Sequence, residues 1–239
     1  MANDTHVRIF KRGVKEWNQW RLEYPEITPD LSGEDFSRLT DTELKFADLS
    51  DTNLSGCNLD YAYMKGTKLI RARLEGTQCH NATLIEADLT EAKLLGTRLS
   101  RANLYKAICV GADFSGSYLG GASFVETQVD AATFDNCEVY GLSAWDLKGT
   151  PKSQLNLIVT PPGHPAVTAD ELEVAQLIYL FLSNPKIRKI IDTVVEKAVL
   201  ILGRFTEERI IVLRKLKGAF ETRATYLFYL ILSNHIAVI

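Results

Sequence analysis

An apolar residue returns every five positions through almost one hundred residues of this chain. From Leu44 to Val139, twenty successive positions at this spacing hold Leu, Met, Cys, Phe or Val. The residue two places before each is Ala, Thr, Ser or Cys, and the residue between them is polar at seventeen of the twenty. A period of five fits neither the 3.6-residue turn of an α-helix nor the two-residue alternation of a strand. Each group of five residues must therefore form one repeating structural unit.

Within each unit, three residues alternate inward, outward and inward as in a short strand, and two residues remain to turn a corner. The second corner residue is Gly at positions 56, 66, 76, 96, 111, 116, 121 and 141, and Asn at positions 81 and 136. These residues adopt a positive φ at low cost, as tight turns often require. We therefore expect each pentapeptide to form one side and one corner of a coil, with coils stacked ~4.8 Å apart.

The repeats resemble those of the pentapeptide-repeat family, whose pattern is A(D/N)LXX. A-D-L stands at 47–49 and 87–89, A-N-L at 102–104, and A-D-F, with phenylalanine in place of leucine, at 112–114. The resemblance covers residues 37–143 and implies a mainly β fold, a right-handed quadrilateral parallel β-helix with four pentapeptides per coil and about five coils. Such a solenoid needs a cap at both ends, because its terminal coils expose a core and a pairing edge. We place the repeat domain at residues 37–146.

Residues 1–36 are expected to form an N-terminal helical cap. Val14, Trp17 and Trp20 lie at helical spacing, and Pro25 and Pro29 would end that helix. The run from Trp17 to Pro25 is similar to the entry segments of bacterial members of the family, which indicates a bacterial protein. We expect Trp17 and Trp20 to fill the end of the rod rather than to bind a ligand.

Residues 147–169 contain four prolines and predict an extended linker. Beyond it, residues 170–239 predict a helical hairpin followed by a β-α-β unit. The expected elements are helices that begin near 172 and 185, a strand at 198–202, a helix at 206–221 and a strand at 225–232. Val199–Thr206 resembles the first strand and loop of Toll/interleukin-receptor-like domains. Because such domains need more elements, we expect a small, incomplete α/β unit, and the resemblance transfers no catalytic residue.

No group of residues suggests catalysis, and we expect a protein that is not an enzyme and holds no cofactor or metal. The four cysteines form no C-x-x-C motif, and all lie at core positions of the repeat, which predicts buried thiols. The net charge of −3 disfavours a general nucleic-acid binder. The chain shows neither a secretory leader nor an apolar run of ~18–20 residues. We therefore expect a cytoplasmic protein without a membrane segment.

Positions twenty residues apart should stack on one corner of a four-sided coil. One such column reads Lys45, Lys65, Ile85, Tyr105, Val125 and Trp145. Its last four members would form an outward apolar strip about 15 Å long. Exposed apolar patches often mark contacts, so we predict that Ile85, Tyr105, Val125 and Trp145 bind protein. The occupant would be the chain's own C-terminal helices or another subunit.

A second apolar feature concerns the axis of the rod. Phe114, Phe124 and Phe134 replace leucine there. They could widen that coil for an end-to-end homodimer, as some members of the family form, or represent ordinary core variation.

Three functions follow from these features. The first is a non-enzymatic scaffold or adaptor whose rod mediates protein–protein interaction. The second is DNA mimicry that inhibits or protects a type II topoisomerase, as in other members of the family; residues 37–143 carry 14 acidic and 10 basic residues, a poor imitation of a phosphate backbone. The third is a truncated nucleotide-binding signalling protein, with an anion site beside Gly203 and Arg204.

Overall fold

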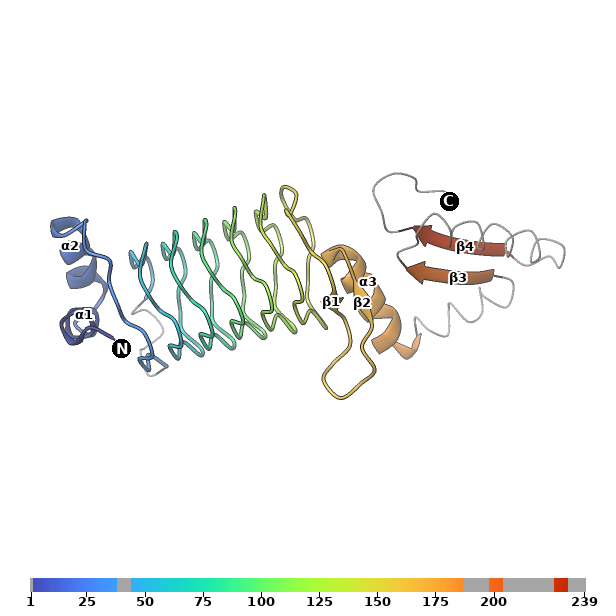
Figure 1. The fold of residues 1–239 in the computed structure, drawn as a ribbon, viewed down its shortest axis with the longest axis horizontal. Coiled ribbons are helices and arrows are strands. Elements are labelled where there is room, and N and C mark those ends of the chain that lie inside the picture. The colour runs from blue at the N-terminus through green and yellow to red at the C-terminus, as the bar shows by residue number, and fades with distance from the viewer. Residues whose placement is uncertain (1, 38–43, 187–197, 204–225, 232–239) are drawn as a thin grey trace. The chain divides into compact units, whose positions relative to one another are not determined.

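A computed structural model describes residues 2–37, 44–186, 198–203 and 226–231. The chain divides into two compact units, Met1–Tyr179 and Leu180–Ile239. The first unit contains α1 (Asp4–Phe10), α2 (Val14–Glu23), the repeats, β1 (Leu157–Ile158), β2 (Thr168–Ala169) and most of α3 (Leu172–Ser183) (Figure 1). The second contains β3 (Ala198–Gly203) and β4 (Tyr226–Ile231).

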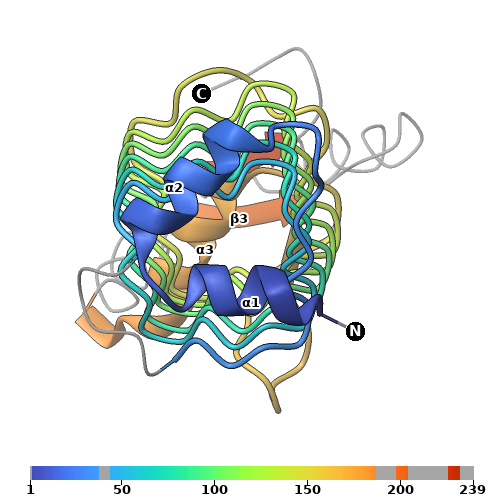
Figure 2. The same cartoon turned by 90° about the vertical axis from the view of Figure 1, so that its left-hand side faces the viewer.

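The repeats form a rod of stacked coils with twenty residues in each coil. Parallel β-bridges join residues twenty positions apart, from Asp48–Lys68 to Glu138–Ile158. Seen from its end, the rod has four sides (Figure 2). The first described coil is longer, because Asp30 pairs with Asn53 across 23 positions. Each side contributes one bridged residue per coil, so the rod is built from isolated bridges rather than from long strands.

Three backbone hydrogen bonds per pentapeptide join neighbouring coils. In the unit around Leu89, the amide of Leu89 donates to Ile108 O at 2.7 Å, Glu91 N to Val110 O at 2.8 Å, and Lys93 N to Ala72 O at 2.9 Å. The same pattern recurs along the described coils. These amide and carbonyl groups are already hydrogen-bonded between neighbouring coils. A partner that binds a side of the rod must therefore do so mainly through side chains.

The axis of the rod is filled as the spacing predicts. All twenty recurrent apolar residues from Leu44 to Val139 are at most 2 % exposed. From Ala47 to Cys137, the small residues two places earlier are also buried, and several of them donate hydrogen bonds. Thr77 Oγ1 donates to Leu54 O at 2.8 Å and Thr97 Oγ1 to Leu74 O at 2.7 Å, each one coil away. Buried hydroxyls at these positions therefore have partners, as burial of a polar group requires.

The corners have a left-handed backbone throughout. Every second corner residue from position 46 to position 146 has a positive φ. The prediction for Gly and Asn is confirmed, yet larger residues such as Arg101 (φ 59°) and Glu126 (φ 56°) adopt the same conformation. A non-glycine residue in this region costs roughly 1–2 kcal/mol, and the inter-coil hydrogen bonds of the repeat offset that cost.

The N-terminal segment forms two helices, where one was expected, and they lie across the first coil of the rod (Figure 2). The Asn3 side chain caps α1 by accepting a hydrogen bond from Thr5 N at 2.9 Å. Trp17 is fully buried, and its Nε1 donates to Asp48 O at 2.7 Å. Arg21 donates to Ile27 O and to Ser50 O. These bonds attach α2 to the coil beneath it.

Residues 147–169 differ from the expected linker, since part of this segment extends the rod. Lys148, Ser153 and Ile158 form bridges with the preceding coil. Leu157 and Val159 are fully buried. They are two positions apart in an extended segment, so both side chains point into the rod. β1 and β2 pair antiparallel, and the prolines at 161, 162 and 165 are confined to the exposed loop that joins them.

α3 covers the end of the rod opposite α1 and α2 (Figure 1). Its residues Leu172, Ala175 and Ile178 are buried. The Gln176 side chain is 6 % exposed, and its Oε1 accepts a hydrogen bond from Ala144 N at 2.5 Å. Ala144 lies in the last part of the repeat, so Gln176 satisfies an amide that no further coil bonds.

In the second unit, β3 and β4 form a parallel pair with Ala198 opposite Tyr226 and Gly203 opposite Ile231. Strands were expected at 198–202 and 225–232, close to these bounds. The helices expected after Pro185 and at 206–221, together with Arg204, lie outside the described residues.

Candidate protein-docking face

The structure places the four predicted site residues on successive coils of one corner. Backbone bonds fix their register: Glu86 N donates to Tyr105 O at 3.0 Å, Lys106 N to Val125 O at 3.1 Å, and Glu126 N to Trp145 O at 2.9 Å. We call Ile85, Tyr105, Val125 and Trp145 the apolar strip. The first three side chains are partly exposed and Trp145 is 56 % exposed. Their role in binding stays a prediction.

Between Tyr63 and Ser143, the side of the rod that leads into this corner carries no charged residue at its described outward positions. Its bridged residues are Tyr63, Thr83, Asn103, Ser123 and Ser143, all partly exposed. We call these five residues the uncharged side. It was not identified from the sequence, although reading every twentieth residue from Tyr63 would have found it. Protein interfaces are depleted of charge at their centre and enriched in Tyr and Trp.

A line of charged residues follows the other edge of the apolar strip. Glu86, Lys106 and Glu126 are the second corner residues of successive coils. Together with Lys65, which precedes Ile85 in the column of the apolar strip itself, they form what we call the charged line. Lys65 Nζ lies 3.6 Å from Glu86 Oε2, and Lys106 Nζ lies 3.6 Å from Glu126 Oε2. The sign of the charge alternates along the rod: basic, acidic, basic, acidic.

Tyr105 connects the apolar strip to the charged line. Its hydroxyl donates to Glu126 Oε1 at 3.0 Å, and Lys106 Nζ lies 4.9 Å from the centroid of its ring. Hydrogen bonding with Tyr105 and the negative charge of Glu126 raise the pKa of Lys106 above its usual value. Lys106 therefore stays a cation at neutral pH, and the alternation of charge is maintained.

An aromatic ring lies at the N-terminal end of this corner. Phe46 is 56 % exposed and lies against Gly66 on the next coil. A Cβ at Gly66 would collide with Cε1 of the Phe46 ring, so only glycine leaves room for the ring in this position. Lys45 Nζ lies 4.9 Å from the centroid of the same ring. The corner thus begins with a cation and an aromatic ring and ends with Trp145.

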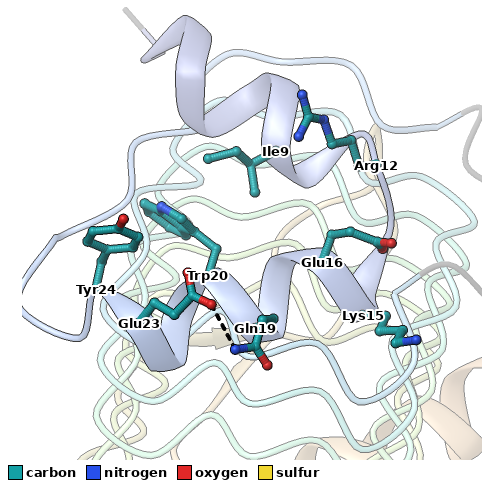
Figure 3. A pocket seen from close by; sticks show the side chains of 8 residues that line it. All are labelled: Ile9, Arg12, Lys15, Glu16, Gln19, Trp20, Glu23 and Tyr24. Atoms are coloured by element: carbon teal, nitrogen blue, oxygen red, sulfur yellow. Dashed lines mark hydrogen bonds between the residues drawn. The ribbon is translucent and has the colours of Figure 1, made fainter.

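A second candidate site is the groove between α1 and α2, which measures about 510 Å³ (Figure 3). Trp20, Tyr24 and Ile9 line it together with charged side chains of both signs, including Arg12 and Glu16. Gln19 Nε2 donates to Glu23 Oε1 at 2.8 Å, along the α2 wall of the groove. The groove is open and mixed in character, and no ligand class follows from its lining.

The thiols of the rod are unsuited to nucleophilic chemistry. All four cysteines are free and buried, as predicted. Burial raises the pKa of Cys57 to about 11 and that of Cys137 to about 12, and it raises those of Cys79 and Cys109 further. The reactive species of a thiol is the thiolate, which such pKa values suppress at neutral pH.

Two histidines contact aspartates that are distant from them in the sequence. His80 Nδ1 lies 2.8 Å from Asp60 Oδ1, because Asp60 precedes it by one coil. His6 Nδ1 accepts a hydrogen bond from Asp30 N at 3.1 Å, and burial lowers the pKa of His6. Within the described ranges, no three His, Cys, Asp or Glu side chains are grouped as metal ligands would be.

The three phenylalanines of the axis contact one another rather than the surface. Phe114 and Phe134 stack with centroids 4.8 Å apart, and Phe124 meets both edge-on. All three are fully buried. The end-to-end homodimer expected from them stays a prediction.

The pentapeptide-repeat family model matches residues 37–76 and 82–121, in eight copies. This match supports the right-handed β-helical solenoid that the resemblance implied, and it does not extend to residues 122–239. No curated protein sequence matches the chain. In the described part of the chain, none of the helices combines the length and the hydropathy of a membrane span.

Three solved structures illustrate the likeness. Rfr23 from the cyanobacterium Cyanothece 51142 is 24% identical, and the match covers 56% of this chain and 97% of that one with a TM-score of 0.33. A pentapeptide-repeat protein from the Arabidopsis thaliana thylakoid lumen is 18% identical, with 59% and 94% covered and a TM-score of 0.37. HetL from Nostoc is 20% identical, with 51% and 85% covered and a TM-score of 0.23.

Proposed function

Because the matched coils of this chain are pentapeptide repeats, we propose that it is a non-enzymatic scaffold or adaptor whose β-helical rod binds another protein. The binding surface is the apolar strip together with the uncharged side. A cytoplasmic location and a bacterial origin belong to the same proposal.

One observation carries the proposal: four apolar side chains stand in line on an edge whose adjoining side bears no charged residue between Tyr63 and Ser143. Inter-coil hydrogen bonds hold the backbone of this surface at every layer. A surface that is already ordered loses little conformational entropy when it binds. Tyr105 and Trp145 are the residue types that most often dominate binding energy at interfaces.

The α1–α2 segment and α3 support the same function in another way. Trp17 and Arg21 attach α2 to one end of the rod, and Gln176 attaches α3 to the other. We propose that both segments cap the solenoid. Capped ends prevent the rod from extending through its open coils, which leaves its sides available for specific partners.

The geometry does not favour DNA mimicry. A mimic needs unpaired carboxylates along one side, whereas three acidic residues of this rod pair with basic residues of neighbouring coils. Asp51 forms a bidentate contact with Arg71 at 2.7 Å, and Glu86 and Glu126 lie beside lysines. The nucleotide-binding alternative depends on Arg204 and its surroundings, which lie outside the described residues.

The test compares proximity labelling in cells by the wild type and by two strip variants, Tyr105→Asp and Trp145→Asp. Leu95→Asp is the matched control, because Leu95 is also the first residue of a corner and is 41 % exposed, but on a different edge of the rod. We expect both strip variants to lose the same labelled proteins and the control to keep them. Identical labelling by all four chains would reject the docking face.

A further inference from the structure

Resting on this proposed function, we propose that the partner of the docking face is a second copy of the chain, bound side by side and antiparallel. The two-fold axis crosses the apolar strip between the coils of Ile85 and Tyr105. Each rod then presents its apolar strip and its uncharged side to those of the other.

The charged line is self-complementary under this symmetry. An axis perpendicular to the rod, midway between the coils of Glu86 and Lys106, places Glu86 opposite Lys106 of the partner subunit. It also places Lys65 at the level of Glu126 of the partner subunit. Every charge on the line therefore lies at the level of an opposite charge of the partner subunit, twice by symmetry, as an isologous interface requires.

The ends of the strip complement each other in the same arrangement. Lys45 comes to the level of Trp145 and Asp146 of the partner subunit. Trp145 is 56 % exposed, and tryptophan is the most favourable aromatic partner for a cation such as lysine. At the centre, Ile85 comes opposite Tyr105 of the partner subunit. The apolar centre is thus flanked by charge pairs, which is the usual anatomy of an interface.

The same charged line opposes a parallel arrangement. A two-fold axis along the rod would bring equal levels together but exchange the two edges of the strip. The charged line of each subunit, with Glu86 and Lys106, would then lie against the uncharged side of the other. Charges buried without an opposite charge lose their hydration uncompensated, which disfavours that arrangement. The charged line therefore selects one orientation of the second copy.

The expected interface is small. Six coil levels at ~4.8 Å, across one side and one corner, bury on the order of 1,000 Å² in total, near the lower limit for a specific interface. We therefore expect a reversible dimer with a dissociation constant in roughly the micromolar range. It would form at micromolar concentrations and dissociate on dilution.

The experiment is sedimentation equilibrium of the full chain with two charge reversals, Glu86→Lys and Lys106→Glu. Each reversal alone puts like charges together at both symmetry-related sites, so we expect about tenfold or greater loss of self-association. An equimolar mixture of the two variants restores opposite charges at both sites and should regain the dimer. Glu91→Lys, at an exposed second corner residue on another edge, is the matched control and should dimerise like the wild type.

A wild type that stays monomeric throughout, or a dimer that ignores both reversals, would overturn the proposal. So would a mixture that recovers no association. These results can be told apart from failure of the docking face itself. If the wild-type chain is monomeric but Tyr105→Asp still loses labelled proteins in cells, the docking face exists and binds a different protein. If each reversal dissociates the dimer and the mixture restores it, the antiparallel arrangement stands.

Discussion

The hydroxyl of Tyr105 donates a hydrogen bond to Glu126 Oε1, 3.0 Å away on the next coil. The two residues are 21 positions apart in the chain, so the contact exists only because a coil contains twenty residues. It joins the apolar strip to the charged line, and it orients an aromatic ring that the proposed partner would cover. The proposed binding surface and the fold therefore depend on the same twenty-residue register of the coils.

The buried hydroxyls offer a direct test of how the coils are joined. Thr97→Val keeps the volume of the side chain and removes the hydrogen bond to Leu74 O. That carbonyl still accepts Thr77 N at 3.0 Å. We expect a loss of about 1 kcal/mol in the free energy of unfolding, measured with urea. Thr133→Val, on the partly exposed outer side of a coil, is the control; an equal loss there would contradict this account.

The raised pKa values of the buried cysteines lead us to expect that the free energy of unfolding falls at alkaline pH. Burial raises the pKa of Cys57 to about 11 and of Cys137 to about 12, whereas a thiol in the unfolded chain ionises near pH 9. Between these values the unfolded chain releases protons that the folded chain keeps, so stability falls as pH rises, by up to about 1.4 kcal/mol per thiol for each pH unit. Below about pH 9 the contribution of these thiols is constant.

The control for this prediction is the double variant Cys57→Ala and Cys137→Ala. Alanine occupies the same position of the repeat in many coils, for instance at Ala87, so the substitution suits the site. The urea midpoint of the double variant should fall less steeply than that of the wild type between pH 9 and pH 10.5. Parallel pH profiles would show that these thiols are not responsible.

Much of the rod could be predicted from the sequence, because its constraint is local and repeats every five residues. The inward position of Leu89 and the stacking of Ile85 on Tyr105 follow from counting. The partners of His6 and His80 could not be found by inspecting neighbours, since they lie about one coil away. The uncharged side escaped notice because its members are unremarkable one by one and share a property only at a spacing of twenty.

Residues 147–169 show where composition misleads. Prolines suggested a linker, yet Leu157 and Val159 are fully buried. The prolines at 161, 162 and 165 are confined to a loop that leaves the rod and returns, so they do not interrupt its pairing. The second helix at the N-terminus was missed because α1 is only seven residues long, too short to show a clear period.

A comparison of alanine substitutions at Gly66 and Gly96 distinguishes the cost of backbone strain from the cost of a steric clash. Both have φ near +64°, but a Cβ at Gly66 would meet the Phe46 ring, whereas nothing lies within 4 Å of one at Gly96. We expect Gly96→Ala to cost about 1 kcal/mol and Gly66→Ala to cost more. In a Phe46→Ala background the two glycine substitutions should become equivalent in thermal unfolding. A difference that persists without the ring would contradict the contact.

The amide of Ala144 tests the covering of the rod by α3. Gln176→Ala leaves that buried N–H without its acceptor, which costs about 1–3 kcal/mol. We expect α3 to become accessible to limited proteolysis while the coils stay resistant. Glu173→Ala, at an exposed position of the same helix, should leave the digestion pattern unchanged. Faster cleavage in the control, or none in Gln176→Ala, would count against a capping role.

The central claim is that residues of the apolar strip stand on adjacent coils, and a disulfide tests it most directly. Residues on neighbouring coils have Cα atoms ~4.8 Å apart, within the roughly 4.4–6.8 Å that a disulfide spans. The four native thiols are buried and should not interfere. The measurement is the intact mass of the oxidised monomer after alkylation. Ile85→Cys with Tyr105→Cys should form an internal disulfide, whereas Leu95→Cys with Tyr105→Cys, on different corners, should not; the opposite result, or equal oxidation of both, would contradict the account.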